Sequence, residues 1–169
     1  MDRTHLFHQL ARHGNVFRAL FTGLAPDEII WRSAPDKWCA LEIICHLHDE
    51  EREDFKARLK HVLETPDESM PKIDPQAWVT ERKYVKQDFS SVLHKFLDER
   101  RMSVEWLRGL TDAPWSNAYL HPKVGPVSCD LLLTNWVAHD LHHIRQFNNL
   151  RYEYVKAHAS VPLDYAGKW

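Results

Sequence analysis

Four segments of the chain carry apolar residues at steps of three and four, the period that gives an α-helix one buried face. Segments of this length suit bundle helices, since an α-helix rises about 1.5 Å per residue. Only 5 glycines occur, and no convincing pair of strands is found. The sequence therefore predicts an all-α fold, a four-helix bundle with long connections. The predicted helices cover residues 2–24, 38–64, 87–110 and 128–149.

Prolines and polar residues mark the connections between these helices. Residues 65–74 are expected to form a loop. The pattern over residues 75–86 is ambiguous, and a separate short helix is one interpretation of it. The proline-rich stretch 111–127 predicts either a crossover or a short extended ribbon. Ser128 is a good N-cap for the last helix. Beyond that helix we expect further helix over residues 151–159, followed by a tail.

Size and charge limit the classes of protein to which the chain can belong. A length of 169 residues, 44% of them hydrophobic and 27% charged, predicts one globular domain over residues 1–169. The net charge of −2 argues against a nucleic-acid partner, and the nearest basic candidate, Arg100-Arg101, lies in a mixed-charge helix. No segment is apolar enough to span a bilayer, and the N-terminus lacks the apolar core of a signal peptide. We therefore expect a cytoplasmic protein without a membrane or nucleic-acid partner.

Cysteine and histidine are two residue types that bind transition metals. Cys39, Cys45 and Cys129 form no Cys-x-x-Cys pair and fall in helical patterns, so we expect buried free thiols. Twelve histidines are spread along the chain. The question is which few of them converge.

The strongest local signal is the pair His139 and His143. The two residues are one helical turn apart, which places their Cβ atoms about 5–6 Å apart on one face. They share the apolar stripe of Leu132, Trp136 and Phe147 and therefore point inward. An inward imidazole needs a polar partner, and one metal ion would serve both residues. The alternative is that each is a core histidine bonded to a carbonyl or carboxylate.

A third ligand has to come from another helix. Residues 38–64 offer His46 and His48, and His46 shares its face with several acidic residues. Such residues can orient an imidazole, although an acidic helix face is more often simply solvated. Spacing alone leaves the choice between His46 and His48 open.

Two motifs resemble those of the DinB-like superfamily. In the first, Trp38, Glu42, His46 and Glu51 match a pattern of Trp, Glu, a metal-binding His and a later acidic residue. In the second, the run from His139 through His143 to Gln146 resembles His-x-x-x-His-x-x-Gln. The motifs occur in the family's order, and the resemblance extends from about Thr4 to Asn149. One departure is Cys39, where the family usually has Ser or Thr, and it concerns a helix cap.

The resemblance implies an up-down-down-up four-helix bundle, often dimeric, that binds one divalent ion such as zinc or nickel. It selects His46 over His48, so His46, His139 and His143 are the implied ligands, with water completing the site. Members of the family resemble metal-dependent hydrolases and thiol-dependent S-transferases.

Three histidines with open positions are typical of a catalytic metal site. We expect attack on a small electrophile by water or by a low-molecular-weight thiol. The candidate catalytic residues are Asp49 or Glu50, as a base or as a residue that orients a ligand, and Gln146, which could brace the site. Trp38 and Trp136 are candidates for the pocket wall and equally for the core.

Three other interpretations belong to different classes of protein. In the first, the chain is a non-catalytic, stress-related bundle that the metal stabilises. The second is a His-Asp phosphohydrolase, whose further ligands cannot be placed in this sequence. The third is a ferritin-like di-iron protein, which needs Glu-x-x-His motifs, and the spacing from Glu42 to His46 does not fit.

Overall fold

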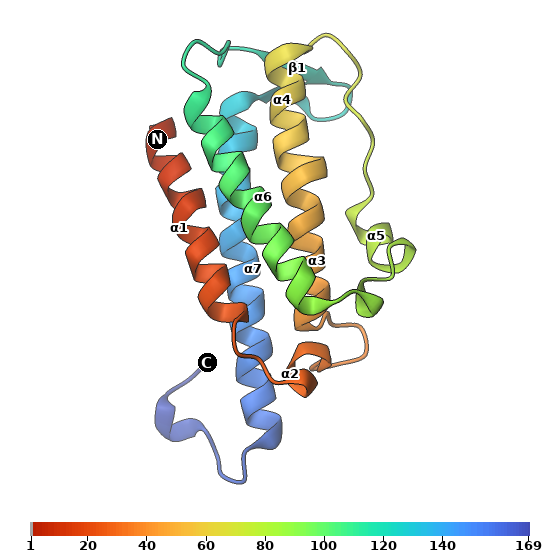
Figure 1. Ribbon diagram of the computed structural model, residues 1–169, viewed down its shortest axis with the longest axis vertical. Helices are drawn as coiled ribbons and strands as arrows, with labels where there is room; N and C mark the ends of the chain where they lie inside the picture. The colour runs from red at the N-terminus through yellow and green to blue at the C-terminus, as the bar shows by residue number, and fades with distance from the viewer. Residues whose placement is uncertain (1) are drawn as a thin grey trace.

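Four long helices pack side by side in the computed structural model, which describes residues 2–169 (Figure 1). In Figure 1 the first and last helices run downward, and the second and third run upward. This is the up-down-down-up order that the family resemblance implied, so the predicted all-α bundle is confirmed. The first helix is α1 (Arg3–Phe21), the second is built from α3 (Ala40–Asp49), η1 (Glu50–Phe55) and α4 (Lys56–Glu64), and the others are α6 (Phe89–Gly109) and α7 (Cys129–His158).

The second and third helices run in the same direction, so the chain between them returns along the bundle. This connection holds the short helices α5 (Pro75–Glu81) and η2 (Tyr84–Lys86), both of which contact α3. The carboxylate of Asp74 accepts a hydrogen bond from the backbone N–H of Ala77 at 3.1 Å and so caps α5. The predicted loop over 65–74 and short helix within 75–86 are confirmed, and α5 is brought against the side of α3.

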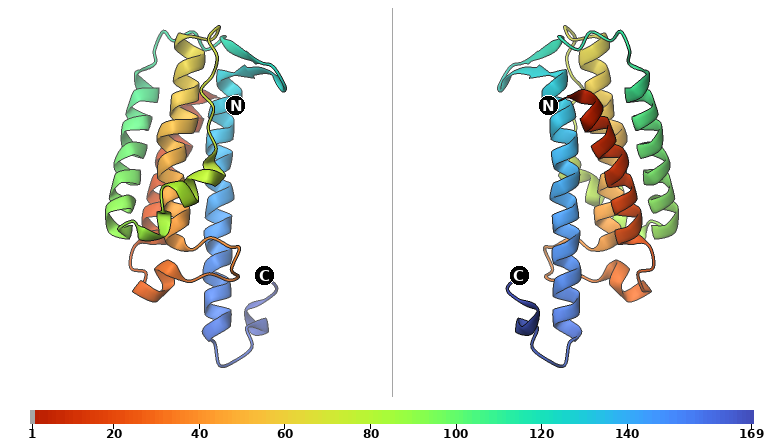
Figure 2. Two further views of the ribbon diagram at one scale, coloured as in Figure 1. Left: turned by 90° about the vertical axis from the view of Figure 1, so that its right-hand side faces the viewer. Right: turned by 90° about the vertical axis from the view of Figure 1, so that its left-hand side faces the viewer.

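A two-stranded antiparallel hairpin precedes α7, where the sequence left a crossover or an extended ribbon open. Strand β1 (Ala118–His121) pairs with β2 (Gly125–Ser128), with Tyr119 opposite Val127. Gly125 has φ 81°, which lets the chain enter the second strand after a short turn. The absence of a convincing strand pair in the sequence was therefore misleading: strands of four residues are too short to show a two-residue alternation. Figure 2 shows the hairpin projecting from one end of the bundle.

The last helix is longer than the segment predicted from the apolar stripe. Ser128 Oγ accepts a hydrogen bond from the backbone N–H of Leu131 at 3.1 Å, which confirms the predicted N-cap. The helix then continues without a break to His158, so the further helix expected over 151–159 is part of α7. Its end projects beyond the bundle, and the C-terminal tail, with η3 (Asp164–Ala166), turns back beside it (Figure 2). Among the described residues, no helix is both long and apolar enough to cross a membrane.

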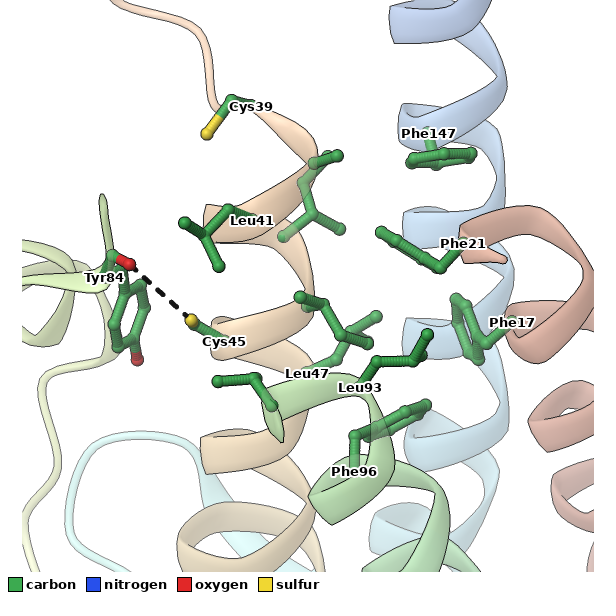
Figure 3. Close-up of a cluster of buried hydrophobic side chains, with 14 of the residues drawn as sticks. Phe17, Phe21, Cys39, Leu41, Cys45, Leu47, Tyr84, Leu93, Phe96 and Phe147 are labelled. Atoms are coloured by element: carbon green, nitrogen blue, oxygen red, sulfur yellow. Dashed lines mark hydrogen bonds between the residues drawn. The ribbon is translucent and has the colours of Figure 1, made fainter. Parts of the chain in front are cut away.

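Aromatic side chains from three helices fill one half of the core (Figure 3). Phe17 of α1 meets Phe96 of α6 edge to face, with ring centroids 5.4 Å apart. Phe21 packs on Phe147 of α7 at 4.2 Å. The three cysteines are buried and unpaired, as predicted, and Figure 3 shows Cys45 beside the carbonyl of Tyr84. This packing fixes α7 relative to α1 and α6, and α7 carries two of the predicted ligands.

Candidate metal centre

The structure brings His46, His139 and His143 together. His139 and His143 lie one turn apart on α7, with their Nε2 atoms 3.0 Å apart. His46 approaches from α3, with its Nε2 3.4 Å from that of His139. The candidate ligand atoms of all three lie within 4.8 Å of one another. His48 lies elsewhere, with its Nδ1 3.8 Å from Asp49 Oδ1.

Burial keeps the three imidazoles in the neutral form that binds metals. It lowers the pKa of His139 to about 2, that of His46 to about 3 and that of His143 to about 4. For His46 and His139 the nearby His143 lowers the pKa further, because adjacent positive charges repel. At neutral pH the group therefore offers nitrogen lone pairs rather than positive charges.

Hydrogen bonding fixes one of these imidazoles in the tautomer that a metal needs. Nδ1 of His143 lies 2.7 Å from Oε1 of Gln146, an acceptor, so His143 carries its proton on Nδ1 and presents a lone pair at Nε2. The ring of Trp38 packs on His46 at 4.9 Å. Nδ1 of His46 is buried without a hydrogen-bond partner among residues 2–169. Neutral lone pairs that converge at 3.0–3.4 Å need a proton or cation between them, so the donor set fits a divalent ion such as zinc or nickel.

A cavity of about 500 Å³ opens from the three histidines. Because three protein ligands converge among residues 2–169 and a cavity faces them, the site resembles an open metal centre rather than a closed structural one. Pro75 and Gln76 place the start of α5 at this cavity, which is one consequence of the long return connection. The other lining residues are Asp36, Lys37, Trp38, Glu50, His142 and Gln146.

Three consecutive acidic residues, Asp49 to Glu51, are all buried one turn after His46. Glu50 begins η1, a π-helical turn of six residues that interrupts the helix predicted over 38–64. A π-helical turn is wider than an α-helical one and is often found at functional sites. The three carboxylates have different neighbours, so they cannot share one role.

Of these three acidic residues, Glu50 is the one that lines the cavity. Its Oε2 lies 4.0 Å from Nε2 of His139. Burial and the adjacent Asp54 raise the pKa of Glu50 to about 8. A carboxyl group with this pKa can hold or release a proton near neutral pH.

Asp49 lies outside the lining of this cavity and is held by three donors. It accepts hydrogen bonds from Tyr84 Oη at 2.7 Å and Arg52 Nη2 at 2.9 Å, and Arg82 Nη1 lies at 2.8 Å. Burial opposes ionisation of Asp49, but these hydrogen bonds and the charge of Arg82 together hold its pKa below the ordinary value. Asp49 therefore joins α3 to the connection that carries Arg82 and Tyr84.

Glu51 is part of a buried ionic cluster that links the four long helices. Arg100 of α6, only 3% exposed, donates to both carboxylate oxygens of Glu51 at 2.9 and 2.8 Å. It also donates to both oxygens of Asp140 at 2.6 and 2.8 Å. His13 of α1 lies 3.1 Å from Asp140, and Trp136 donates to Glu51 at 2.9 Å. We call these residues, His13, Glu51, Arg100, Trp136 and Asp140, the Arg100 cluster.

Sequence reasoning missed the role of Arg100, which it placed in a mixed-charge helix. Its position offered one signal: Arg100 is four residues after Phe96 and seven before Leu107, on the buried stripe of α6.

Trp38 and Trp136, the two tryptophans considered for the pocket wall, lie in different places. Trp38 lines the cavity, whereas Trp136 is buried and stacks on Phe55 with ring centroids 5.9 Å apart.

Comparison with known proteins agrees with this architecture. A family model described as the DinB superfamily matches residues 9–147. The solved structure of YfiT from Bacillus subtilis, described as a probable metal-dependent hydrolase with an unusual four-helix bundle topology, superposes with a TM-score of 0.79 at 18% identity. The alignment covers 90% of this chain and 87% of that one, and at this identity it establishes a shared fold. No curated protein matches the sequence.

Proposed function

Because this chain belongs to the DinB superfamily, we propose that it binds one divalent metal ion, zinc or nickel, through His46, His139 and His143. We propose further that it is a metal-dependent hydrolase or a thiol-dependent S-transferase acting on a small electrophile. The observation that carries the proposal is the convergence of three neutral imidazoles at the inner end of an open cavity. YfiT, described as a probable metal-dependent hydrolase, supports the hydrolase alternative.

A bound ion would act as a Lewis acid and lower the pKa of the water or thiol that attacks. In this proposal Glu50 accepts the proton of the nucleophile at Oε2, since it faces the cavity and its pKa is raised to about 8. Gln146 holds the tautomer of His143. Trp38 forms an apolar wall that limits the access of bulk water to the reacting group.

Asp49 has a positioning role in the same proposal. Its carboxylate is occupied by Tyr84, Arg82 and Arg52, and no part of it lines the cavity. It holds the return connection against α3, and that connection brings Pro75 and Gln76 to the cavity.

A second candidate function is a non-catalytic metal-binding bundle. The observation that favours it is that the ligands come from two different helices, so an ion would tie α3 to α7 and stabilise the fold.

We also propose that the protein is a homodimer and that it is cytoplasmic, as expected from the sequence. Analytical ultracentrifugation and localisation of the tagged protein would test them.

Metal content is the first test. Purified wild type, after reconstitution with Zn²⁺ or Ni²⁺ and dialysis, should hold about one ion per chain, as a site of this kind does. The variants His46→Ala, His139→Ala and His143→Ala should each lose it. His48→Ala is the matched control, because His48 is two residues from a ligand and outside the triad, and it should keep the ion. Wild type that holds no ion would overturn the proposal.

The second test asks whether the bound metal has an open coordination position. Its result separates the two candidate functions. The visible spectrum of Co²⁺-loaded protein should change when a small thiol is added, because an open coordination position admits a new ligand. A spectrum that no small ligand alters would favour the non-catalytic bundle. A change in the spectrum would justify a screen of thiols and electrophiles for turnover.

A further inference from the structure

A second cavity adjoins the one that holds the three histidines. It has a volume of about 240 Å³, and Lys37, Trp38 and Gln146 line both cavities. The two cavities therefore lie next to each other along α7, and Lys37, Trp38 and Gln146 form the wall that they share. The remaining residues of the second cavity are Ser33, Asn149, Leu150 and Glu153.

Two side-chain amides, Gln146 and Asn149, lie three residues apart on the same face of α7. Oε1 of Gln146 is occupied by His143 Nδ1 at 2.7 Å. Oδ1 of Asn149 accepts a hydrogen bond from Trp169 Nε1 at 3.0 Å. Since the oxygen of each amide already accepts one hydrogen bond, the NH₂ group, a donor, is the end that each offers most readily to a ligand.

The charges around the second cavity are largely compensated. Lys37 Nζ lies 3.0 Å from Asp36, and Glu153 lies 3.6 Å from Lys156. The amide donors therefore set the chemistry of the cavity more than any net charge does, and they favour oxygen acceptors. Trp38 and Leu150 add apolar surface on which a carbon chain can lie.

We infer that the substrate or co-substrate is an elongated small molecule with its reactive group at the histidine triad and a tail in the second cavity. The tail bears carbonyl or carboxylate oxygens that accept hydrogen bonds from Gln146 and Asn149. Asn149 is the specificity-determining residue, because it lines the second cavity and does not line the cavity of the three histidines. This inference rests on the proposed metal centre, which supplies the anchor for the reactive group.

The test measures binding rather than turnover. Hydroxamic acids bind open metal centres, so acetohydroxamic acid probes the triad alone. A series of alkyl hydroxamic acids of increasing length, each ending in a carboxylate or in a matched methyl group, probes the second cavity. Isothermal titration calorimetry on Zn²⁺-loaded protein should find one chain length at which the carboxylate binds about tenfold more tightly than the methyl analogue, as two added hydrogen bonds would give.

The gain from the carboxylate should depend on Asn149. Asn149→Ala should reduce the gain to about threefold, because Gln146 still donates one of the two hydrogen bonds, and should leave the affinity for acetohydroxamic acid unchanged. Asn148→Ala is the matched control, because Asn148 is the neighbouring amide and lines neither cavity, and it should keep the gain. Trp169→Phe removes the indole donor but leaves the amide of Asn149, so it separates loss of the amide from displacement of the tail and should also keep the gain.

The outcomes distinguish this inference from the proposed function. Wild type that binds no hydroxamic acid would overturn the open metal centre, and this inference with it. Binding of acetohydroxamic acid with no gain from the carboxylate at any chain length would overturn the second-cavity site alone. A gain that is as large in Asn149→Ala as in wild type would also overturn it.

Discussion

Arg100 donates a hydrogen bond to each carboxylate oxygen of Asp140, the residue that directly follows His139 in α7. The same guanidinium donates to both oxygens of Glu51, the residue that directly follows Glu50 in η1. The Arg100 cluster therefore holds the backbone next to a candidate ligand and next to the candidate proton acceptor. It places α7 and η1 at a fixed separation beneath the cavity.

Removal of the guanidinium should destabilise the protein strongly. Arg100→Met leaves two buried carboxylates without their cation, a change that typically costs about 3–5 kcal/mol. Urea unfolding of the metal-free protein would measure it. Arg101→Met is the matched control, since Arg101 is exposed and forms a surface ion pair with Glu105, and it should change the stability by less than about 0.5 kcal/mol. Equal effects of the two substitutions would contradict the role of the cluster.

Gly14 of α1 should be required for the close approach of Arg100. A Cβ atom at Gly14 would lie 3.2 Å from Cγ of Arg100, whose guanidinium is held on both sides. Gly14→Ala should therefore destabilise the fold by about 1 kcal/mol, as the close contact outweighs the better helix propensity of alanine. At Gly109 nothing lies within 4 Å of the added atom, so Gly109→Ala should be neutral or stabilising. Thermal unfolding of both variants beside wild type would measure the two effects.

Gln146 should control metal affinity through the tautomer of His143. Gln146→Leu removes the acceptor at Nδ1, and loss of such a partner typically weakens metal binding by about 10–100-fold. Competition with a chromophoric chelator would measure the affinity. Gln146→Glu restores an acceptor and should recover most of the binding, whereas a purely steric role for Gln146 would leave both variants equally weak.

The metal-free protein should lose stability in acid because of the three histidines. Their pKa values in the folded chain, about 4 for His143, 3 for His46 and 2 for His139, lie below the ordinary value of 6.5. The unfolded chain therefore binds more protons than the folded chain below about pH 6.5, and stability falls as the pH is lowered from there toward 4. Chemical unfolding across this range should show the slope, and replacement of all three by glutamine should flatten it.

Glu50 should make the folded protein less stable as the pH rises, the opposite of the effect of the three histidines. Its pKa in the folded protein is raised from 4.5 to about 8, mainly by burial. Its protonated form stabilises the folded state fully below about pH 4.5, and this contribution is lost as the pH rises toward 8. Glu50→Gln mimics the protonated carboxyl group, so metal-free Glu50→Gln should gain stability relative to wild type as the pH rises through this window. A constant difference between the two proteins would contradict the raised pKa.

The sequence alone determined the four long helices and two of the three candidate ligands, His139 and His143. Apolar residues spaced three and four apart indicate which face of a helix is buried, because local backbone geometry sets the direction of each side chain along a helix. The same geometry places His139 and His143 together on α7. Ser128 at the helix start and the loop before α5 were also predicted, since caps and prolines act locally.

Only the tertiary structure decided which side chains from different helices meet. His46 and His48 are two residues apart, and the packing of α3 against α7 brings one of them, His46, to the triad. Asp49, Glu50 and Glu51 are consecutive acidic residues that point in different directions from the helix, so each has different neighbours. Partners such as Tyr84, His139 and Arg100 lie tens of residues away along the chain, and no local period encodes which of those residues packing will bring into contact.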